Sequence, residues 1–472
     1  MRIVNRSLRF EIEDQMKQHG YNINQLAELS GINPGNLNMA LNGITRSMTI
    51  SQLDSLAKVF GKVPGWLYEL YTEECISDEK LSRPRLIRYL VRCAEIGRSD
   101  CINAVVAKML DNPKNIKVIF AAAEKLYQKG KRKESEHFYE IVVDSVKDSF
   151  SEMLAVSHYR LFTVMQGTDA EKNWKAVIRF DPYRNRLPDS YRLDALFQLA
   201  KVCYSLKKWN EVEEYAGELV ELSTVLSGLE EIAPKRHPVY YYGMGLLYKG
   251  AVLERRGLYD RAKEYVLNYM NLEWPEPLDE FGQKELEQFK IWGKANLYTL
   301  ELLTGNQGIV NEYADYLASL NRLNDVVSGL NAIVLSANTY GFNVDHVLTR
   351  FSGPIARFDL LNSDPILSER HLRFRYHKAI YEFRNDRVQQ GINETLHCLS
   401  LANVMKKYED SIQCVALFET YREWASAEQL KMYRSVMGVR EEVYLDEVLF
   451  PSPDYRIGAT WYSRAICAAE SK

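Results

Sequence analysis

The chain has 472 residues, and its 60 Lys and Arg against 63 Asp and Glu give a formal net charge of −3. Hydrophobic residues make up 46% and charged residues 26%, a balance that is typical of folded proteins and excludes a disordered or collagen-like chain. The near-neutral charge gives no overall indication of a nucleic-acid-binding protein. At about 100–200 residues per domain, the length predicts roughly two to four domains, unless the chain is an array of repeats.

Cysteine usage and hydropathy predict a cytoplasmic protein. The seven cysteines form no Cys-x-x-Cys pair, so we expect reduced thiols. No apolar run approaches the ~18 residues that a membrane span needs, and we expect no membrane association. The first six residues lack the apolar stretch of a signal peptide, so none is expected.

Apolar residues recur almost throughout with the helical period of about 3.6 residues, and sustained alternation typical of strands is not found. The sequence therefore predicts an all-α protein. Helical segments are short before residue 70, and they become longer and paired after residue 80. We expect a small N-terminal domain, a linker, a long helical domain and a C-terminal cap or tail, over residues 1–71, 72–84, 85–450 and 451–472.

The small domain is predicted to contain five short helices, at about residues 5–18, 24–30, 34–41, 50–59 and 64–71. The second and third of these carry the strongest signal. Leu26 and Ala27 are expected to face inward, because a small side chain is needed where two helices cross closely. Gly31 permits a tight turn with positive φ, and Ile32 is expected to fill the core beneath that turn.

The third helix begins with an Asn-Pro pair that is typical of a helix start. Asn33 can cap the helix, and Pro34 suits its first position. Leu37 and Leu41 are four residues apart and are expected to form its buried face. This pattern predicts a helix-turn-helix in which residues 34–42 would enter a major groove of DNA.

The order and spacing of these residues resemble the phage-repressor-like (XRE/Cro-type) helix-turn-helix. The resemblance runs from Leu8 through Asn42-Gly43 to the segment ending at Leu67. In that family, base contacts come from the first turn and the middle of the third helix. The resemblance therefore implies DNA-binding residues among Gln25, Asn33, Gly35, Asn36, Asn38, Met39, Asn42 and Arg46.

The chemistry of this surface is polar but hardly charged. Asn33, Asn36 and Asn38 can read adenine edges or contact phosphates, whereas Gly35 and Met39 offer no side-chain hydrogen bonds. Residues 1–70 hold seven Lys and Arg against six Asp and Glu. Because affinity for DNA depends largely on phosphate neutralisation, a monomer should bind weakly, and a dimer on one operator is expected. The alternative is a helix-turn-helix used for protein binding or dimerisation.

From about residue 100 a pattern recurs with a unit of about 34 residues, which is typical of tetratricopeptide repeats. In the clearest copy, Gly257 ends the first helix, Tyr259 packs at the turn and Ala262 lies at the crossing of the two helices. Further copies start near Leu196 and Ala122. Stacking of such pairs predicts a right-handed α-solenoid with a concave inner groove.

The groove of such a solenoid can accept an extended peptide, because amide side chains pair with peptide backbone and apolar side chains form pockets. Repeat positions place a set of polar and aromatic candidates there: Gln198, Lys201, Tyr204, Tyr248, Arg255 and Asn296. For each aromatic in this set, a place in the helical core is the alternative.

A helix-turn-helix of this type joined to a tetratricopeptide solenoid is similar to the RRNPP group of peptide-pheromone receptors. The resemblance implies a cytoplasmic quorum-sensing transcriptional regulator, commonly a homodimer, that binds a double-stranded DNA operator and a short imported signalling peptide. The peptide would shift the DNA-binding conformation of the dimer. In that group, polar residues on inner helices hold the peptide backbone, which implies Gln198, Asn296 and Asn331 here.

Two other functions remain open: an interaction protein whose solenoid sequesters a protein partner, and a phage-type lysogeny regulator. An enzyme is not expected, since the sequence has no phosphate-binding loop, nucleophile elbow or nicotinamide fingerprint. His371 and His377 are six residues apart and would lie on different helix faces, so neither a metal site nor a cofactor is expected.

Overall fold

A computed structural model describes seven segments of the chain: residues 7–42, 48–76, 82–148, 150–227, 235–275, 277–361 and 364–438. These segments contain 24 α-helices and a few 3₁₀ turns, and no strand occurs within them, which confirms the predicted all-α fold. No helix in these segments is long and apolar enough to cross a membrane. The five cysteines whose side chains are described are buried free thiols.

The chain divides into two compact units. Unit 1 comprises residues 1–165 and 178–192, and unit 2 comprises residues 166–177 and 193–472. Two of the boundaries lie inside helices α11 (Ala170–Phe180) and α12 (Asp189–Ser205).

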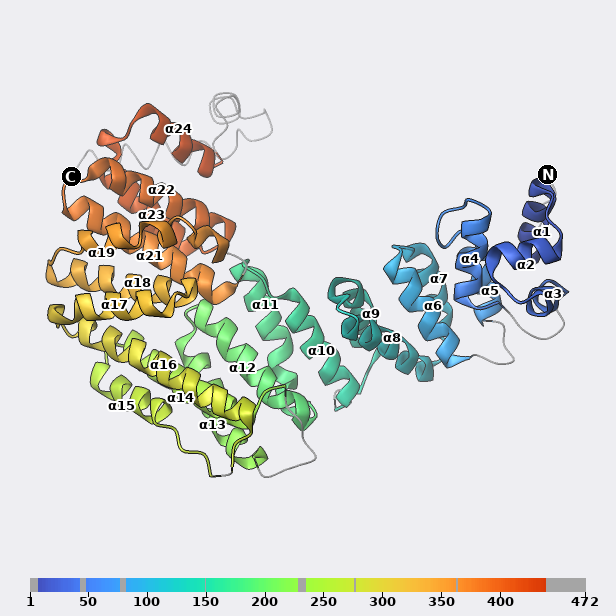
Figure 1. The fold of residues 1–472 in the computed structure, drawn as a ribbon, viewed down its shortest axis with the longest axis horizontal. Helices are drawn as coiled ribbons and strands as arrows, with labels where there is room; N and C mark the ends of the chain where they lie inside the picture. Colours follow the sequence, from blue (N-terminus) through green and yellow to red (C-terminus); the bar gives the residue numbers. More distant parts are fainter. Residues whose placement is uncertain are drawn as a thin grey trace, which may run out of the picture. The chain divides into compact units, whose positions relative to one another are not determined.

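Unit 1 contains the predicted helix-turn-helix and the helices that follow it (Figure 1). Its helices are α1 (Leu8–His19), α2 (Ile23–Ser30), α3 (Pro34–Asn42), α4 (Ile50–Val59), α5 (Tyr68–Ile76), α6 (Arg83–Glu95), α7 (Ser99–Met109), α8 (Ile116–Gln128), α9 (Arg132–Ser145) and α10 (Glu152–Met165). Their apolar side chains form one core that includes residues from Leu8 to Leu161.

The first four helices agree with the predicted ranges to within a few residues, but the fifth does not. It begins at Tyr68 rather than at residue 64, because Gly65 takes a φ of 80° that an α-helix does not allow. Residues 64–67 form turns instead. The helix then extends to Ile76, into the segment that the sequence analysis assigned to a linker.

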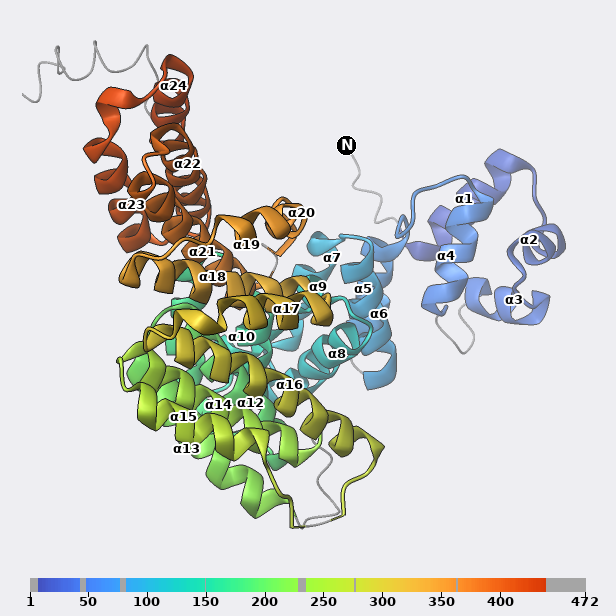
Figure 2. The same ribbon diagram turned by 60° about the vertical axis from the view of Figure 1, so that its left-hand side comes forward.

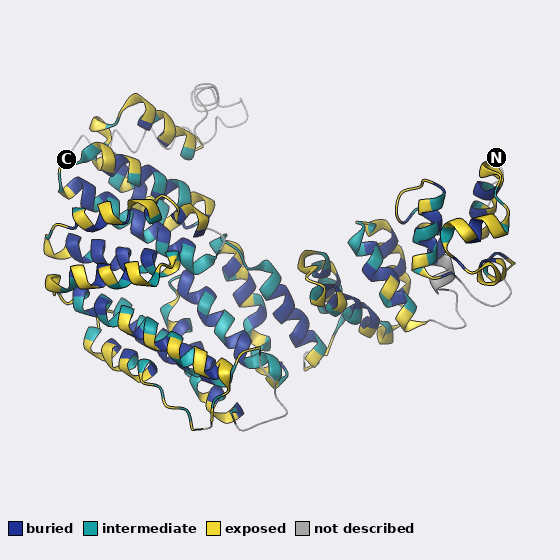
Figure 3. Ribbon diagram, viewed as in Figure 1, coloured by how far each residue is buried: buried dark blue, intermediate teal, exposed yellow. Residues whose placement is uncertain are grey.

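Unit 2 is a stack of helices that contact their neighbours in chain order (Figures 1 and 2). After α12 it contains α13 (Trp209–Leu226), α14 (Pro238–Arg255), α15 (Tyr259–Met270), α16 (Glu280–Leu303), α17 (Val310–Leu320), α18 (Leu323–Tyr340), α19 (Asp345–Arg350), α20 (Ser352–Ile355), α21 (Pro365–Arg384), α22 (Val388–Val404), α23 (Tyr408–Thr420) and α24 (Ala427–Val436). The helices are amphipathic: on α15, Ala262, Val266 and Tyr269 are spaced four and three apart and are buried. Figure 3 shows exposed residues along the other side of such helices.

Glycines allow the closest helix crossings in this stack. A Cβ atom on Gly245 of α14 would lie 2.9 Å from the carbonyl oxygen of Ala216 in α13 and 2.6 Å from the Val220 side chain. On α18, a Cβ on Gly329 would lie 2.3 Å from Leu317. These helices therefore approach one another more closely than any larger residue would permit.

The first helices of unit 2 contact the last ones. Lys201 of α12 pairs with Asp364, with Nζ and Oδ2 2.7 Å apart, and Lys407 donates to the carbonyl oxygen of Ser205 at 2.8 Å. Three further contacts of this kind are Lys207 with Asp410, Lys406 with Asp169, and the backbone N–H of Ala170 with the carbonyl oxygen of Met405. We call these five contacts the polar seam, and they close the stack of unit 2 on itself.

Substitution of Gly245 by Ala should destabilise the chain by about 1–3 kcal/mol, because the added methyl group meets the backbone of α13, which cannot move aside cheaply. Gly217→Ala is the matched control on α13, where the new Cβ would lie 3.8 Å from the flexible Lys249 side chain. At this position the higher helix propensity of Ala should raise the free energy of unfolding by about 0.5–1 kcal/mol. Urea unfolding followed by circular dichroism measures both, and equal effects in the two variants would contradict the close crossing.

Candidate functional site

Helix α2 is fixed at both ends by local interactions that its sequence encodes. The Asn22 side chain accepts a hydrogen bond from the backbone N–H of Gln25 at 2.9 Å, and the Gln25 side chain accepts one from the backbone N–H of Asn22 at 2.9 Å. This capping box satisfies two otherwise unpaired amides. Gly31 ends the helix with a φ of 67°, as predicted for the turn.

Helix α3 begins at Pro34 and is capped by Asn33. The Asn33 side-chain oxygen accepts hydrogen bonds from the backbone N–H groups of Gly35 at 2.9 Å and Asn36 at 3.3 Å. The cap predicted from the sequence is therefore confirmed. The residues predicted to face the core are buried as well: Leu26, Ala27, Ile32, Leu37 and Leu41.

The opposite face of α3 is exposed and uncharged. Asn36, Asn38, Met39 and Asn42 lie on it, and Asn42 donates a hydrogen bond to the side-chain oxygen of Asn38 at 2.7 Å. Gly35 and Asn38 also line an open depression between the first turns of α2 and α3. Seven of the eight residues predicted to bind DNA are exposed, namely Gln25, Asn33, Gly35, Asn36, Asn38, Met39 and Asn42, and Arg46 lies outside the described residues.

Buried tyrosines join this helix-turn-helix to α6. The Tyr68 hydroxyl donates to Asp54 at 2.8 Å, and Asp54 also accepts a hydrogen bond from Arg92 of α6 at 2.8 Å. The Tyr89 hydroxyl donates to the backbone oxygen of Tyr68 at 2.9 Å. Burial, reinforced by Asp54, raises the pKa of Tyr68, so its hydroxyl stays protonated and keeps donating.

Unit 2 contains a partly open cavity of about 380 Å³ that is lined by α12, α14, α15, α16, α17, α18 and α21. Four of the residues predicted to bind a peptide line it: Lys201, Tyr204, Tyr248 and Asn296. The other three do not, and each has a different position. Gln198 is half-buried next to the lining, Arg255 is half-buried and donates to the Tyr204 hydroxyl at 2.9 Å, and Asn331 is buried within α18.

The polar groups of the cavity come from helices that are far apart in the sequence. Arg322 pairs with Asp325 at 3.2 Å, and Arg370 of α21 donates to the hydroxyl of Ser328 in α18 at 2.8 Å. Asn296 donates to the hydroxyl of Tyr269 at 2.7 Å. The predicted set includes no residue of α21 and only Asn331 of α18, because no repeat spacing connects those helices to α12 and α14.

Burial and pairing shift the carboxylates of this cavity in opposite directions. Burial raises the pKa of Asp325 above its usual range, although Arg322 and Arg370 oppose the shift. Burial would also raise the pKa of Asp364, but its contacts with Lys201 and with backbone amides of α21 outweigh that effect and lower it.

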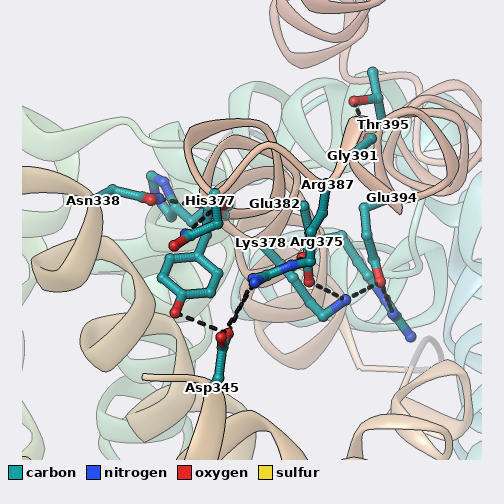
Figure 4. A network of polar contacts seen from close by, with 12 residues as sticks. Asn338, Asp345, Arg375, His377, Lys378, Glu382, Arg387, Gly391, Glu394 and Thr395 are labelled. Atoms are coloured by element: carbon teal, nitrogen blue, oxygen red, sulfur yellow. Dashed lines mark hydrogen bonds and ion pairs between the residues drawn. The ribbon is translucent and has the colours of Figure 1, made fainter. Parts of the chain in front are cut away.

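Beside the cavity, α21 carries an extended network of ion pairs (Figure 4). Glu394 of α22 accepts from Arg375 at 3.0 Å and from Lys378 at 2.5 Å, and Lys378 also pairs with Glu382 at 3.2 Å. Arg387 extends this network, because it pairs with Glu382. Burial raises the pKa of Glu394, but the two cations outweigh burial and lower it. These charges are satisfied by one another, which favours a structural role.

One group of side chains in the described segments has the composition of a metal site. Asp359, His371 and His397 bring one ligand atom each to within 4.8 Å of the others. Arg375, however, donates its Nε–H to Nε2 of His371 at 2.9 Å, so the proton of this neutral imidazole lies on Nδ1. The nitrogen nearest to Asp359 therefore has no free lone pair, which disfavours a cation there.

Comparison with known families identifies the N-terminal part of the chain. Residues 11–73 match the family of Cro/C1-type HTH DNA-binding domains. No curated protein matches the chain significantly. The match covers the capped helices α2 and α3 described above, and it confirms the resemblance that the sequence analysis drew for this region.

Removal of the Asn33 cap should loosen α3. Asn33→Ala leaves the first amides of the helix without their acceptor, at a cost of about 0.5–2 kcal/mol, whereas Asn33→Ser retains a capping oxygen. Hydrogen exchange of the α3 amides should therefore accelerate in the Ala variant only. Equal exchange in the Ala variant and the wild type would show that the cap does not stabilise α3.

Acid should destabilise unit 2 through two histidines of α21, the buried His371 and the half-buried His377. Burial, with help from Arg373 and Arg255, lowers the pKa of His377 to about 3, and burial and Arg375 do the same for His371. An unfolded histidine has a pKa near ~6.5, so the unfolded chain binds the proton first and stability falls as the pH drops below about 6.5. Between pH 7 and pH 5, each histidine should lower the free energy of unfolding by about 2 kcal/mol.

Urea unfolding at pH 5, 6 and 7 measures this slope. His377→Asn should reduce it, and His346→Asn, at an exposed histidine of α19, should leave it unchanged. A slope that His377→Asn does not alter would contradict the assignment.

Proposed function

Because residues 11–73 form a Cro/C1-type DNA-binding domain, the chain is a DNA-binding transcriptional regulator, and we propose that a short peptide bound by unit 2 controls it. The observation that carries the proposal is the partly open cavity of unit 2, in a chain that also has a DNA-binding domain. In this proposal the protein is a cytoplasmic quorum-sensing regulator with a tetratricopeptide-like solenoid as its receptor part.

The DNA contact is proposed to come from the uncharged face of α3. Asn36 and Asn38 offer amide groups that can pair with both N6 and N7 of adenine in the major groove. Met39 can contact a thymine methyl group. Because residues 1–70 have seven basic against six acidic residues, phosphate attraction is weak, and a homodimer that presents two copies of α3 would supply the missing affinity.

The ligand is proposed to be a short peptide. The cavity volume of about 380 Å³ lies in the range of small-ligand sites, and aromatic walls with a few polar groups are typical of them. Asn296 has an amide that can pair with peptide backbone, and Phe197 and Trp292 provide apolar contacts. A stable protein partner would instead bury roughly 800 Å² on each side, more than the lining of this cavity offers.

Peptide binding would act by shifting a population of conformations. The peptide must prefer one state of the regulator, and a hundredfold preference corresponds to about 2.7 kcal/mol. The phage-type lysogeny regulator is the same mechanism in another genomic setting, and a neighbouring reading frame for a secreted peptide would favour the pheromone receptor.

Capture of genomic DNA with the full chain, with and without culture supernatant, tests the regulator. We expect a small set of enriched sites whose occupancy changes with supernatant. The absence of enriched sites under both conditions would contradict the proposed function.

Replacing the amides on α3 should weaken operator binding. Asn36→Ala and Asn38→Ala are each expected to cost about 1–3 kcal/mol and to relax the preference at one base pair. Asn103→Ala, at an exposed residue of α7 in the same unit, is the control. Fluorescence anisotropy with the captured operator measures all three, and unchanged base preference in both α3 variants would exclude these residues as readers.

A further inference from the structure

The charged side chains that line the cavity are paired with one exception. Lys201 pairs with Asp364 at 2.7 Å, and Arg322 pairs with Asp325 at 3.2 Å. Glu254 lies 3.7 Å from its neighbour Arg255. Among the described residues, Arg370 alone of the lining charges has no opposite charge within 4 Å, and its hydrogen bond goes to the neutral hydroxyl of Ser328.

Tyr248 of α14 presents a second polar group to the same cavity. Its side chain is 3% exposed, and its ring packs against Phe197 and Tyr204. No hydrogen bond joins its hydroxyl to any residue in the described part of the chain. Burial raises the pKa of Tyr248 well above its usual value while Arg370 opposes the shift, so the group is a protonated donor that lies within the field of Arg370.

A guanidinium and a phenolic hydroxyl together suit a carboxylate. The planar guanidinium donates two parallel hydrogen bonds to the two carboxylate oxygens, and the tyrosine can donate a third. A single unpaired cation matches a single negative charge. A doubly charged phosphate would meet stronger repulsion from Glu254, Asp325 and Asp364, which line the same cavity.

We infer that the cavity binds its ligand through a carboxylate held between Arg370 and Tyr248, with an apolar group of the ligand against Phe197 and Trp292. The inference rests on the proposed ligand-binding function of unit 2. The carboxylate can be the free C-terminus of a peptide or an acidic side chain, and both sources share this chemistry.

Four probes separate the sources: random hexapeptides without Asp and Glu that have a free C-terminus, the same peptides with a C-terminal amide, amidated peptides that contain Glu, and phenylacetate. The full chain captures peptides from each pool, mass spectrometry identifies them, and the resynthesised peptides give dissociation constants. Phenylacetate is tested by the shift it causes in the thermal unfolding midpoint.

The variants are Arg370→Gln and Tyr248→Phe, with Arg384→Gln as control at an exposed residue in the last turn of α21. We expect peptides with a free C-terminus or with Glu to bind and amidated peptides without acidic residues not to bind. Arg370→Gln should weaken binding about ten- to hundredfold and Tyr248→Phe about tenfold, and Arg384→Gln should leave it unchanged. Wild-type unfolding midpoints in the variants exclude misfolding as the cause.

The remaining outcomes separate this inference from the proposed function. Equal capture of free and amidated peptides without acidic residues, or full affinity in Arg370→Gln, would overturn the carboxylate site and leave the peptide receptor intact. A third outcome is that phenylacetate stabilises the wild type but not Arg370→Gln, and that no peptide is captured. This result would support the carboxylate site and overturn the proposal that the ligand is a peptide. Binding of none of the four probes would overturn both.

Discussion

Lysine side chains join the first helices of unit 2 to the last ones, and both groups of helices line its cavity. Lys201, Lys207 and Lys407 contact residues 163, 203 and 202 positions away in the chain. The cavity lining includes residues of both α12 and α21, and the pair of Lys201 with Asp364 joins them. Ion pairs that are partly buried lose hydration as they gain attraction, so the polar seam contributes less than an apolar interface of the same extent. It is therefore a joint between the first and last helices of unit 2 that contributes little free energy for its extent.

A ligand in the cavity would act on that joint. The lining draws residues from α12 and from α21, and a ligand that contacts both helices binds the closed stack more tightly than the open one. By linkage, closure and binding stabilise each other. The seam also includes Asp169 and Ala170, just before α11 passes into unit 1 at residue 178. These two seam residues are thus close in sequence to the point where the chain passes into unit 1.

The sequence predicted the helix-turn-helix almost completely, because the features that define it are local. Helix caps, a glycine turn and apolar residues four positions apart all depend on residues close together in the chain. The same rules placed Lys201, Tyr204, Tyr248 and Asn296 on the cavity side of their helices. Arg255 was assigned to the groove, but Ala251 and Glu254 line the cavity and Arg255 lies one step further around α14. Asn331 falls one turn beyond the lining residues of α18, which end at Ser328. Arg370 was not predictable, since only the closure of the stack brings α21 to α12.

The chain has 30 tyrosines, and most of the buried ones in the described segments combine aromatic packing with a hydrogen bond. A tyrosine supplies aromatic packing between helices and a hydroxyl that needs a partner when it is buried. Tyr71 donates to the backbone oxygen of Met48, and Tyr139 donates to Glu124. The fully buried tyrosines Tyr68, Tyr89, Tyr241, Tyr269, Tyr313 and Tyr381 also have hydrogen-bond partners. Tyr248 is almost as buried, yet its hydroxyl has no partner among the described residues and lines the cavity. Because this hydroxyl opens onto the cavity, a ligand with an acceptor oxygen can use it as a hydrogen-bond donor.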